Sequence, residues 1–212
     1  MKLYFAPGTC ALAAHISLIE AGIKHQIVRV DLKQKRTADG RDFNQINPKG
    51  YVPALELDGG ALLTENSALL GYIGELNPAA KLIGPAGTME NFRVREWLGY
   101  ISTEIHKNFS PLFHPDTPEA TVQFQRAALT RRVGFINPAL SGRSYLMGET
   151  FTVADAYLFT VLGWSRHLKF DLTPWPALPA FLERVAARKA VQTALQTERE
   201  AKAAARAAVS GA

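Results

Sequence analysis

Residues 1–21 read MKLYFAPGTCALAAHISLIEA. The apolar run Lys2–Phe5 predicts a short strand, and the breaker pair Pro7–Gly8 ends it. From Ala11 to Ala21 apolar residues recur at helical spacing, and a glycine follows as a stop signal. The stretch therefore predicts a strand, a tight turn and a helix, with Cys10 at the point where the helix begins.

The next elements extend this unit to about residue 80. The sequence predicts, in order, a strand at Ile27–Leu32, a polar loop to Lys49, a hairpin of Ala54–Leu57 and Ala61–Thr64, and a helix at Asn66–Leu76. The hairpin is indicated by Asp58–Gly59–Gly60 between its strands. The order β-α-β-loop-β-β-α is that of a thioredoxin-like fold, whose opening β-α-β unit closes with one handedness.

The pattern changes after residue 77. Prolines and glycines gather in residues 78–87, and only helices are predicted beyond them. These helices run from Met89 to Ser110, Thr117 to Leu140, Thr152 to Leu168, Pro176 to Ala187 and Ala190 to Ala208. The sequence therefore predicts an α/β thioredoxin-like domain at residues 1–80, a linker at 81–87 and an all-α domain at 88–212.

Composition narrows the class of protein. The 212 residues carry a formal net charge of +5, but the basic residues are scattered, so we expect no nucleic-acid partner. The chain has one cysteine and therefore no internal disulfide, and it shows neither a signal-peptide pattern nor an apolar run long enough to span a bilayer. We expect no membrane partner and a cytoplasmic location.

Cys10 is the first candidate for chemistry. At a helix N-terminus, free N–H groups and the helix dipole favour a thiolate. The segment Cys10–Ala11–Leu12–Ala13 occupies the place of a C-x-x-C motif but lacks its second cysteine. Any thiol chemistry must then use one sulfur, through a mixed disulfide or by stabilising a bound thiol. The alternative is an inert, buried small residue.

Two further segments predict peptide recognition. Pro53 at the start of a strand predicts a cis Val52–Pro53 bond, with the Val52 backbone open to an extended peptide; a plain trans proline is the alternative. The helix that starts after Thr64 can bind a carboxylate, and Glu65 beside it can bind an ammonium. Simple capping by Thr64 or Asn66 is the alternative there.

The remaining candidate groups lie in the helical half. His106 shares a helix face with Phe109, Ser110 and Phe113, where a structural histidine is the alternative to a functional one. The other histidines show no metal-ligand spacing, so we expect no metal. Thr152 and Asp155 form a predicted capping box, which assigns Asp155 to folding.

Five segments together resemble the beta-class glutathione transferases of bacteria, in register across nearly the whole chain. They are MKLYFAPGTCALAAHISL, NPKGYVPAL, LLTEN, STEIHKNFSPLFHPDTPE and FTVADAYLFTVLGWS. The resemblance implies glutathione as co-substrate with no other cofactor, and a homodimer. It implies that Cys10 is the reactive cysteine and that Lys35 meets the glycyl carboxylate of glutathione.

The resemblance assigns further contacts with glutathione. The Val52 backbone would pair with its cysteinyl part, and Glu65 and Asn66 would bind its γ-glutamyl end. The segment that closes the site falls on Thr103, Glu104, Ile105 and His106, with His106 near the sulfur and Glu104 reaching the neighbouring subunit's glutathione. Three positions depart from the family pattern: Ala11 and Gly99 each replace a polar residue, and Asn66 stands where relatives often have a smaller one.

Three functions remain open from the sequence. The first is a transferase that joins the glutathione thiolate to a small hydrophobic electrophile held against Phe109, Phe113, Tyr157 and Trp164. The second is a glutathione-dependent reductase or dehalogenase that uses Cys10 through a mixed disulfide. The third is a carrier of apolar ligands without catalysis.

Overall fold

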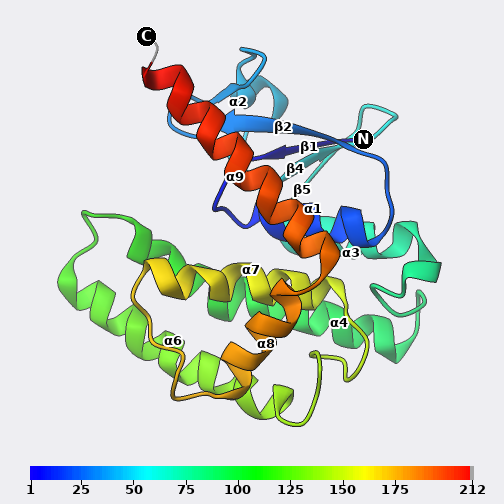
Figure 1. Cartoon of the computed structure of the whole chain (residues 1–212), viewed down its shortest axis with the longest axis vertical. Helices are drawn as coiled ribbons and strands as arrows, with labels where there is room; N and C mark the ends of the chain where they lie inside the picture. Colours follow the sequence, from blue (N-terminus) through cyan, green and yellow to red (C-terminus); the bar gives the residue numbers. More distant parts are fainter. Residues whose placement is uncertain (211–212) are drawn as a thin grey trace. The chain divides into compact units, whose positions relative to one another are not determined.

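The computed structural model describes residues 1–210, and side chains as far as residue 207. The chain forms two compact units: Met1–Ala80 with the chain from Arg188 onward, and Lys81–Ala187. Figure 1 shows that the first unit contains the sheet and that the second consists of helices. The predicted combination of an α/β part and a helical part is confirmed.

Five strands form one mixed sheet in the order β3-β2-β1-β4-β5. They are β1 (Lys2–Phe5), β2 (Gln26–Asp31), β3 (Arg36–Thr37), β4 (Ala54–Glu56) and β5 (Leu62–Thr64). β1 and β2 are parallel, whereas β1–β4, β4–β5 and β2–β3 are antiparallel. Leu3 pairs with Ile27 on one side and with Leu55 on the other, and both leucines are fully buried. The central strand β1 therefore lies in the hydrophobic core of this unit.

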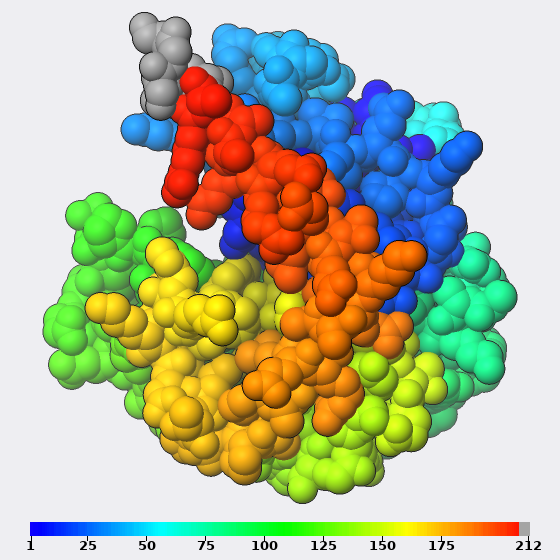
Figure 2. Space-filling model, in the orientation of Figure 1, coloured from blue at the N-terminus to red at the C-terminus, as the bar shows by residue number. Residues whose placement is uncertain are grey.

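Helix α1 (Ala11–Glu20) connects β1 to β2 and packs against α3 (Asn66–Leu76) and α9 (Lys189–Ser210). It ends as predicted, because Gly22 adopts a φ of +66° and the N–H groups of Gly22 and Ile23 donate back to carbonyls of the last turn. Figure 2 shows α9 lying across the surface of this unit. Arg188 anchors the start of α9 through two hydrogen bonds, of 2.6 and 2.9 Å, to the carboxylate of Glu20.

The helical unit is built around α7 (Val153–His167), which packs against α4 (Met89–Tyr100) and α8 (Ala177–Ala186). Its capping box is present as predicted: Thr152 and Asp155 bond reciprocally, and Leu146 N–H also donates to the buried Asp155. α4 continues through η2 (Ile101–His106), α5 (Lys107–Phe109) and η3 (Ser110–Phe113), and α6 (Glu119–Leu140) follows.

Three features differ from the sequence prediction. The polar stretch before Lys49 contains β3 and the short helix α2 (Phe43–Ile46), and η1 (Pro78–Ala80) follows α3. The helix predicted from Met89 to Ser110 is interrupted by η2, which has π-helical geometry. Its register therefore shifts within the segment assigned to ligand closure.

The division of the chain also differs. The predicted all-α domain ran from residue 88 to residue 212, but α9 groups with the sheet-containing unit. Within the segment 81–87, Leu82 and Ile83 are buried, and the Leu82 carbonyl accepts from Val153 N–H at 3.0 Å, whereas residues 85–87 are exposed. The hydrophobic periodicity of an amphipathic helix shows that one face is buried but does not show which unit buries it. The sequence therefore could not assign α9 to the sheet-containing unit.

Candidate functional site

Cys10 lies half-buried where β1 leads into α1. The turn before it contains Gly8, whose φ of +80° is a left-handed conformation that glycine adopts without steric cost. The Cys10 thiol donates to the carbonyl oxygen of Val52, with 3.5 Å between Sγ and O, across 42 positions of sequence. The thiol therefore sits at a helix start and against the loop that precedes β4.

Val52 precedes a cis peptide bond to Pro53, which confirms that prediction. Its carbonyl faces Cys10, and its N–H has no hydrogen-bond partner within residues 1–210. Val52 is 8% exposed, and buried backbone groups are nearly always paired. The unpaired N–H is therefore a position where a ligand backbone can bind.

Lys35 reaches the same loop from the turn between β2 and β3. Its ammonium donates to the Gly50 carbonyl at 2.8 Å and lies 5.8 Å from the centre of the Tyr51 ring. An ammonium has three donors, and the carbonyl takes only one. Lys35 is thus held close to Val52 in the chain and can still bind an anionic group.

Glu65 begins α3 with an unusual backbone. Its φ of +68° is positive, which L-residues rarely adopt and which is found most often at functional sites. Glu65 is the N-cap of α3 and its side chain makes no capping hydrogen bond, while the Thr64 hydroxyl accepts from the Lys49 ammonium at 3.0 Å. The Glu65 carboxylate instead pairs with the ammonium of Lys49 at 2.7 Å. Lys49 was not among the predicted site residues.

Asn66 is buried and connects the starts of two helices. Its side-chain amide donates to the carbonyl oxygen of Cys10 at 3.2 Å, and its amide oxygen is buried with no partner among the described residues. The resemblance implied a contact with a γ-glutamyl group. The bond to Cys10 uses one of the two amide N–H donors, so Asn66 positions the Cys10 backbone and keeps a second donor and its amide oxygen for the contact that the resemblance implies.

His106 is the last residue of η2 in the helical unit. Its Nδ1 lies 2.6 Å from the hydroxyl of Tyr157, and its ring makes edge contacts with Tyr157 and Trp164. Burial, with a smaller contribution from the charge of Lys107, lowers the pKa of His106 to about 4. The imidazole is therefore neutral at pH 7.

The four aromatic residues predicted to line a second-substrate site separate into two groups. Phe113 is 42% exposed, and Trp164, which it meets edge-on with ring centres 5.3 Å apart, is half-buried. Tyr157 and Phe109 are 1% and 0% exposed. Tyr157 packs against the ring of His106, and Phe109 packs against the ring of Trp164. Of the four residues, only Phe113 and Trp164 therefore have exposed surface that a ligand can contact.

The other residues of η2 also differ in exposure. Ile105 is fully buried, so its side chain belongs to the helical core and does not contact a ligand. Thr103 is exposed and donates to the Gly99 carbonyl at 3.1 Å. Glu104 forms an ion pair with Arg132 of α6. The polar side chains of η2 therefore face outward while its apolar ones pack inward.

Sequence reasoning missed three pairings that these residues make. Lys49 and Glu65 are 16 positions apart, and Glu104 and Arg132 are 28 apart, so no local spacing rule links them. The hydrogen bond between His106 and Tyr157 spans 51 positions.

Residues 1–210 contain no cluster of three or more His, Cys, Asp or Glu side chains suited to a metal ion. In the same residues, no helix has the length and apolarity needed to cross a membrane.

Two family models match the chain. "Glutathione S-transferase, N-terminal domain" matches residues 8–76, and "Glutathione S-transferase, C-terminal domain" matches residues 100–189. The glutathione S-transferase GstA of Escherichia coli O157:H7 is 46% identical over 192 residues, which cover 91% of this chain and 96% of the relative. GST-4.5 of Xanthomonas campestris is 35% identical, with the same two coverages of 91% and 96%.

Solved structures agree with these matches. BphK, a bacterial glutathione S-transferase solved as a ternary complex, is 46% identical with a TM-score of 0.92, over 93% of this chain and 99% of that one. A sphingomonad glutathione S-transferase in complex with glutathione is 40% identical with a TM-score of 0.90, over 93% and 98%. A beta-class enzyme of Sphingomonas chungbukensis gives the same values.

Proposed function

Because the chain belongs to the glutathione S-transferase family, we propose that it catalyses attack of the glutathione thiolate on small hydrophobic electrophiles. The observation that carries this proposal is the arrangement around Cys10. Its thiol meets the Val52 carbonyl at 3.5 Å, and the neighbouring Val52 N–H is unpaired among the described residues. An extended peptide can pair with that backbone and place its own sulfur beside the start of α1.

The charges around this backbone match the ends of glutathione. The glycyl carboxylate would bind the ammonium of Lys35, which keeps free donors beyond its bond to Gly50. The γ-glutamyl end carries an ammonium and a carboxylate. The carboxylate of Glu65 would bind the first, and the N-terminal end of α3 would bind the second. The ion pair between Lys49 and Glu65 would then weaken, because the Glu65 carboxylate would bind the ammonium of the ligand as well.

The helical unit supplies the groups that the family resemblance assigns to the reacting sulfur and to the second substrate. His106 is neutral at pH 7 and would stabilise the thiolate, while Phe113 and Trp164 would contact the apolar electrophile. In the reaction the thiol proton is lost to solvent and the sulfur lone pair forms a carbon–sulfur bond. With an aryl halide, the carbon–halogen bond then breaks and the halide leaves with its electron pair.

Two measurements test this function. Reduced glutathione should raise the melting temperature in a dose-dependent manner, because a ligand that binds only the folded state stabilises it by mass action. γ-Glutamyl-alanyl-glycine, which lacks the sulfur, should also stabilise the protein but give no product. Formation of the thioether from glutathione and an activated aryl chloride should then be followed by absorbance. Absence of both a shift and turnover at millimolar glutathione would reject the proposal.

The setting of the enzyme is part of the proposal. A single cysteine and a reduced-thiol substrate fit the cytoplasm, where thiols stay reduced. We also propose a homodimer, since the resemblance places Glu104 against the substrate of a second subunit. Location of the expressed protein by cell fractionation tests the first statement, and the mass in solution tests the second.

A further inference from the structure

The ring of His106 is held by two residues of one helix. Tyr157 and Trp164 lie seven positions apart on α7, about two helical turns, so both project from the same face. Tyr157 meets the imidazole at 90° with 5.8 Å between ring centres, and Trp164 meets it at 66° with 4.9 Å. Every residue of α7 from Val153 to Leu162 is buried, so the helix is held firmly in the core where it supports this ring.

The Tyr157 hydroxyl also bonds to one nitrogen of that ring. The distance from Oη to Nδ1 is 2.6 Å, and the hydroxyl belongs to a side chain that is 1% exposed. Of the two possible directions, O–H to nitrogen is favoured, because a phenol is a stronger donor than a neutral imidazole N–H. An imidazole nitrogen is likewise a stronger acceptor than a phenol oxygen. The Nδ1 atom is then the acceptor and carries no proton.

A neutral imidazole has one N–H, and the bond made by one nitrogen fixes the protonation of the other. We propose that Tyr157 fixes His106 as the tautomer with its proton on Nε2, so that His106 offers a ligand a hydrogen-bond donor and not a base. Nε2 has no hydrogen-bond partner among the described residues, and the ring is only half-buried. The donor therefore remains free for a ligand.

This inference rests on the proposed function for its chemical meaning and specifies one role within it. A donor N–H stabilises a sulfur that is already anionic, whereas a free Nε2 lone pair would remove the proton from a neutral thiol. With Nδ1 occupied by Tyr157, the ligand group that suits Nε2–H is a thiolate or another anion. Tyr157 is thus a positioning residue that acts through His106.

Nitrogen-15 NMR of the ring tests the tautomer without any substrate. Protein labelled at histidine should show His106 at pH 7 with a protonated Nε2 and an unprotonated Nδ1. The signals can be assigned by their loss in His106→Gln. A proton on Nδ1 in the folded protein would overturn the inference even if the protein is an active transferase. A confirmed Nε2–H tautomer in a protein without transferase activity would reject the proposed function alone.

Two substitutions test the role in turnover. Tyr157→Phe should lower kcat by roughly three- to tenfold, the cost of one net hydrogen bond, with the KM for glutathione nearly unchanged. Thr160→Val is the matched control, because it also removes a buried hydroxyl from α7, one that donates to the Ala156 carbonyl at 2.8 Å. A Tyr157→Phe variant that behaves like this control in kcat would count against the inference.

His106→Gln separates donor from base. Its side-chain amide can donate from near the position of Nε2 but cannot take a proton at neutral pH. It should keep more activity than His106→Leu, and adding Tyr157→Phe to His106→Leu should cause no further loss of kcat. Equal inactivity of the Gln and Leu variants, in proteins with unchanged melting temperatures, would indicate a base and contradict the proposal.

Discussion

Cys10 illustrates how one side chain can be held by backbone from two other segments. Its thiol bonds to the Val52 carbonyl, and its own carbonyl accepts from Asn66 at the start of α3. Both contacts leave the sulfur half-buried beside the N–H groups that open α1. The contact with Asn66 and the N–H groups that open α1 involve only the backbone at position 10, so they do not depend on the side chain there.

Replacement of Cys10 by serine should therefore separate two chemistries. We expect Cys10→Ser to retain most conjugation of glutathione to an activated aryl chloride, because the donors at the helix start remain. The wild-type protein treated with glutathione disulfide should form a mixed disulfide at Cys10 and release one glutathione thiol, whereas the variant should not. Intact-protein mass spectrometry and the turnover assay measure these effects. Loss of conjugation in the variant would show that the thiol also organises the glutathione sulfur.

Lys35 should act on binding rather than on the chemical step. Removing its ammonium in Lys35→Ala deletes a charge-assisted hydrogen bond to the glycyl carboxylate, which should raise the KM for glutathione by roughly tenfold with kcat nearly kept. Lys33→Ala is the control, because Lys33 is an exposed lysine of the same turn. Steady-state kinetics decide the matter. A fall in kcat with an unchanged KM would contradict a positioning role.

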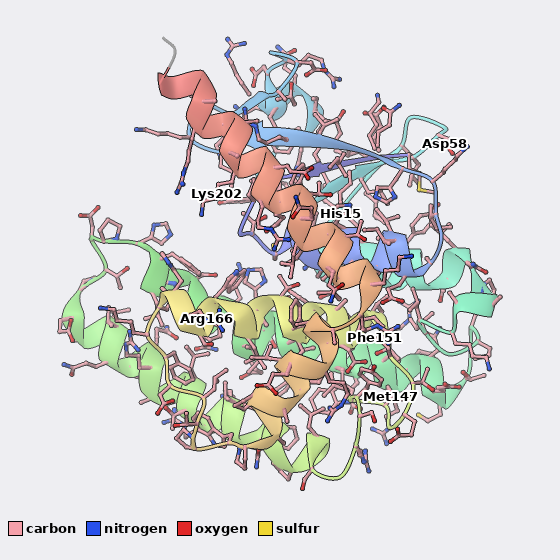
Figure 3. The ribbon with its side chains drawn as sticks, in the orientation of Figure 1. His15, Asp58, Met147, Phe151, Arg166 and Lys202 are labelled. Carbon is pink, nitrogen blue, oxygen red and sulfur yellow. The ribbon has the colours of Figure 1, made fainter. Side chains whose placement is uncertain are left out.

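At the scale of elements, α1 carries a buried histidine that the reaction does not use. His15, labelled in Figure 3, is 5% exposed, and its Nδ1 has no partner among the described residues. The centre of its ring lies 5.3 Å from that of the His25 ring. Burial, with a smaller effect of His25, lowers the pKa of His15 to about 4. The packing of α1 therefore requires this side chain to stay neutral.

The stability of the fold should depend on pH through His15. Its pKa is lower in the folded state than in the unfolded chain, so its contribution is complete above pH 6.5 and is lost as the pH falls toward 4. The lost stability amounts to roughly 3 kcal/mol at most. Glu198 acts in the opposite direction, since burial raises its pKa to about 7 and its contribution is lost as the pH rises through that value.

A single variant separates the contribution of His15 from that of Glu198. His15→Leu places an apolar side chain in the core that cannot be protonated, so the loss of unfolding free energy between pH 6.5 and pH 4.5 should become smaller. Urea unfolding of both proteins at the two pH values gives the comparison. If the two proteins lose equal stability on acidification, His15 is not the group that titrates.

Regular elements follow from local sequence, and irregular ones do not. α3 runs from Asn66 to Leu76, as its apolar spacing and the following Asn77–Pro78 predict. β3 has two residues and α2 has four, which is too few for a periodic pattern to emerge. The π-helical geometry of η2 could not be predicted either, because no residue of Ile101–His106 distinguishes a π-helix from an α-helix.

The same limit applies to the candidate site. Cys10 and the cis bond before Pro53 were predictable, because a helix start and a proline at a strand start are local signals. The positive φ of Glu65, its ion pair with Lys49 and the bond from Asn66 to Cys10 arise from tertiary packing. Burial of Tyr157 and Ile105 was equally hidden, since a helix pattern marks an apolar residue without saying whether a core or a ligand will cover it.

At the scale of the whole molecule, the helical unit exposes an apolar face on α4 and α6. Met89, Phe92 and Phe135 are 68%, 57% and 60% exposed. The ring of Phe135 packs on Tyr100 and Trp97, with centres 5.2 and 6.3 Å apart. A cavity of about 840 Å³ opens beside these rings. Exposed apolar clusters of this kind usually mark a surface that another protein covers.

We expect a second copy of the chain to cover this face, because the ion pair of Glu104 and Arg132 lines the same cavity and the family resemblance places Glu104 at a subunit boundary. A two-fold dimer would bury the same patch on both copies.

Sedimentation equilibrium at micromolar protein should then give twice the chain mass of 23.2 kDa. Phe135→Arg should shift the protein toward the monomer, because it removes the exposed ring and adds a like charge to a cavity already lined by Arg93, Arg131 and Arg132. Phe124→Arg, at a residue of the same helix that is 66% exposed and does not line the cavity, serves as the matched control. Wild-type protein that is monomeric at this concentration and fully active would reject the dimer and with it any action of Glu104 on a neighbouring subunit.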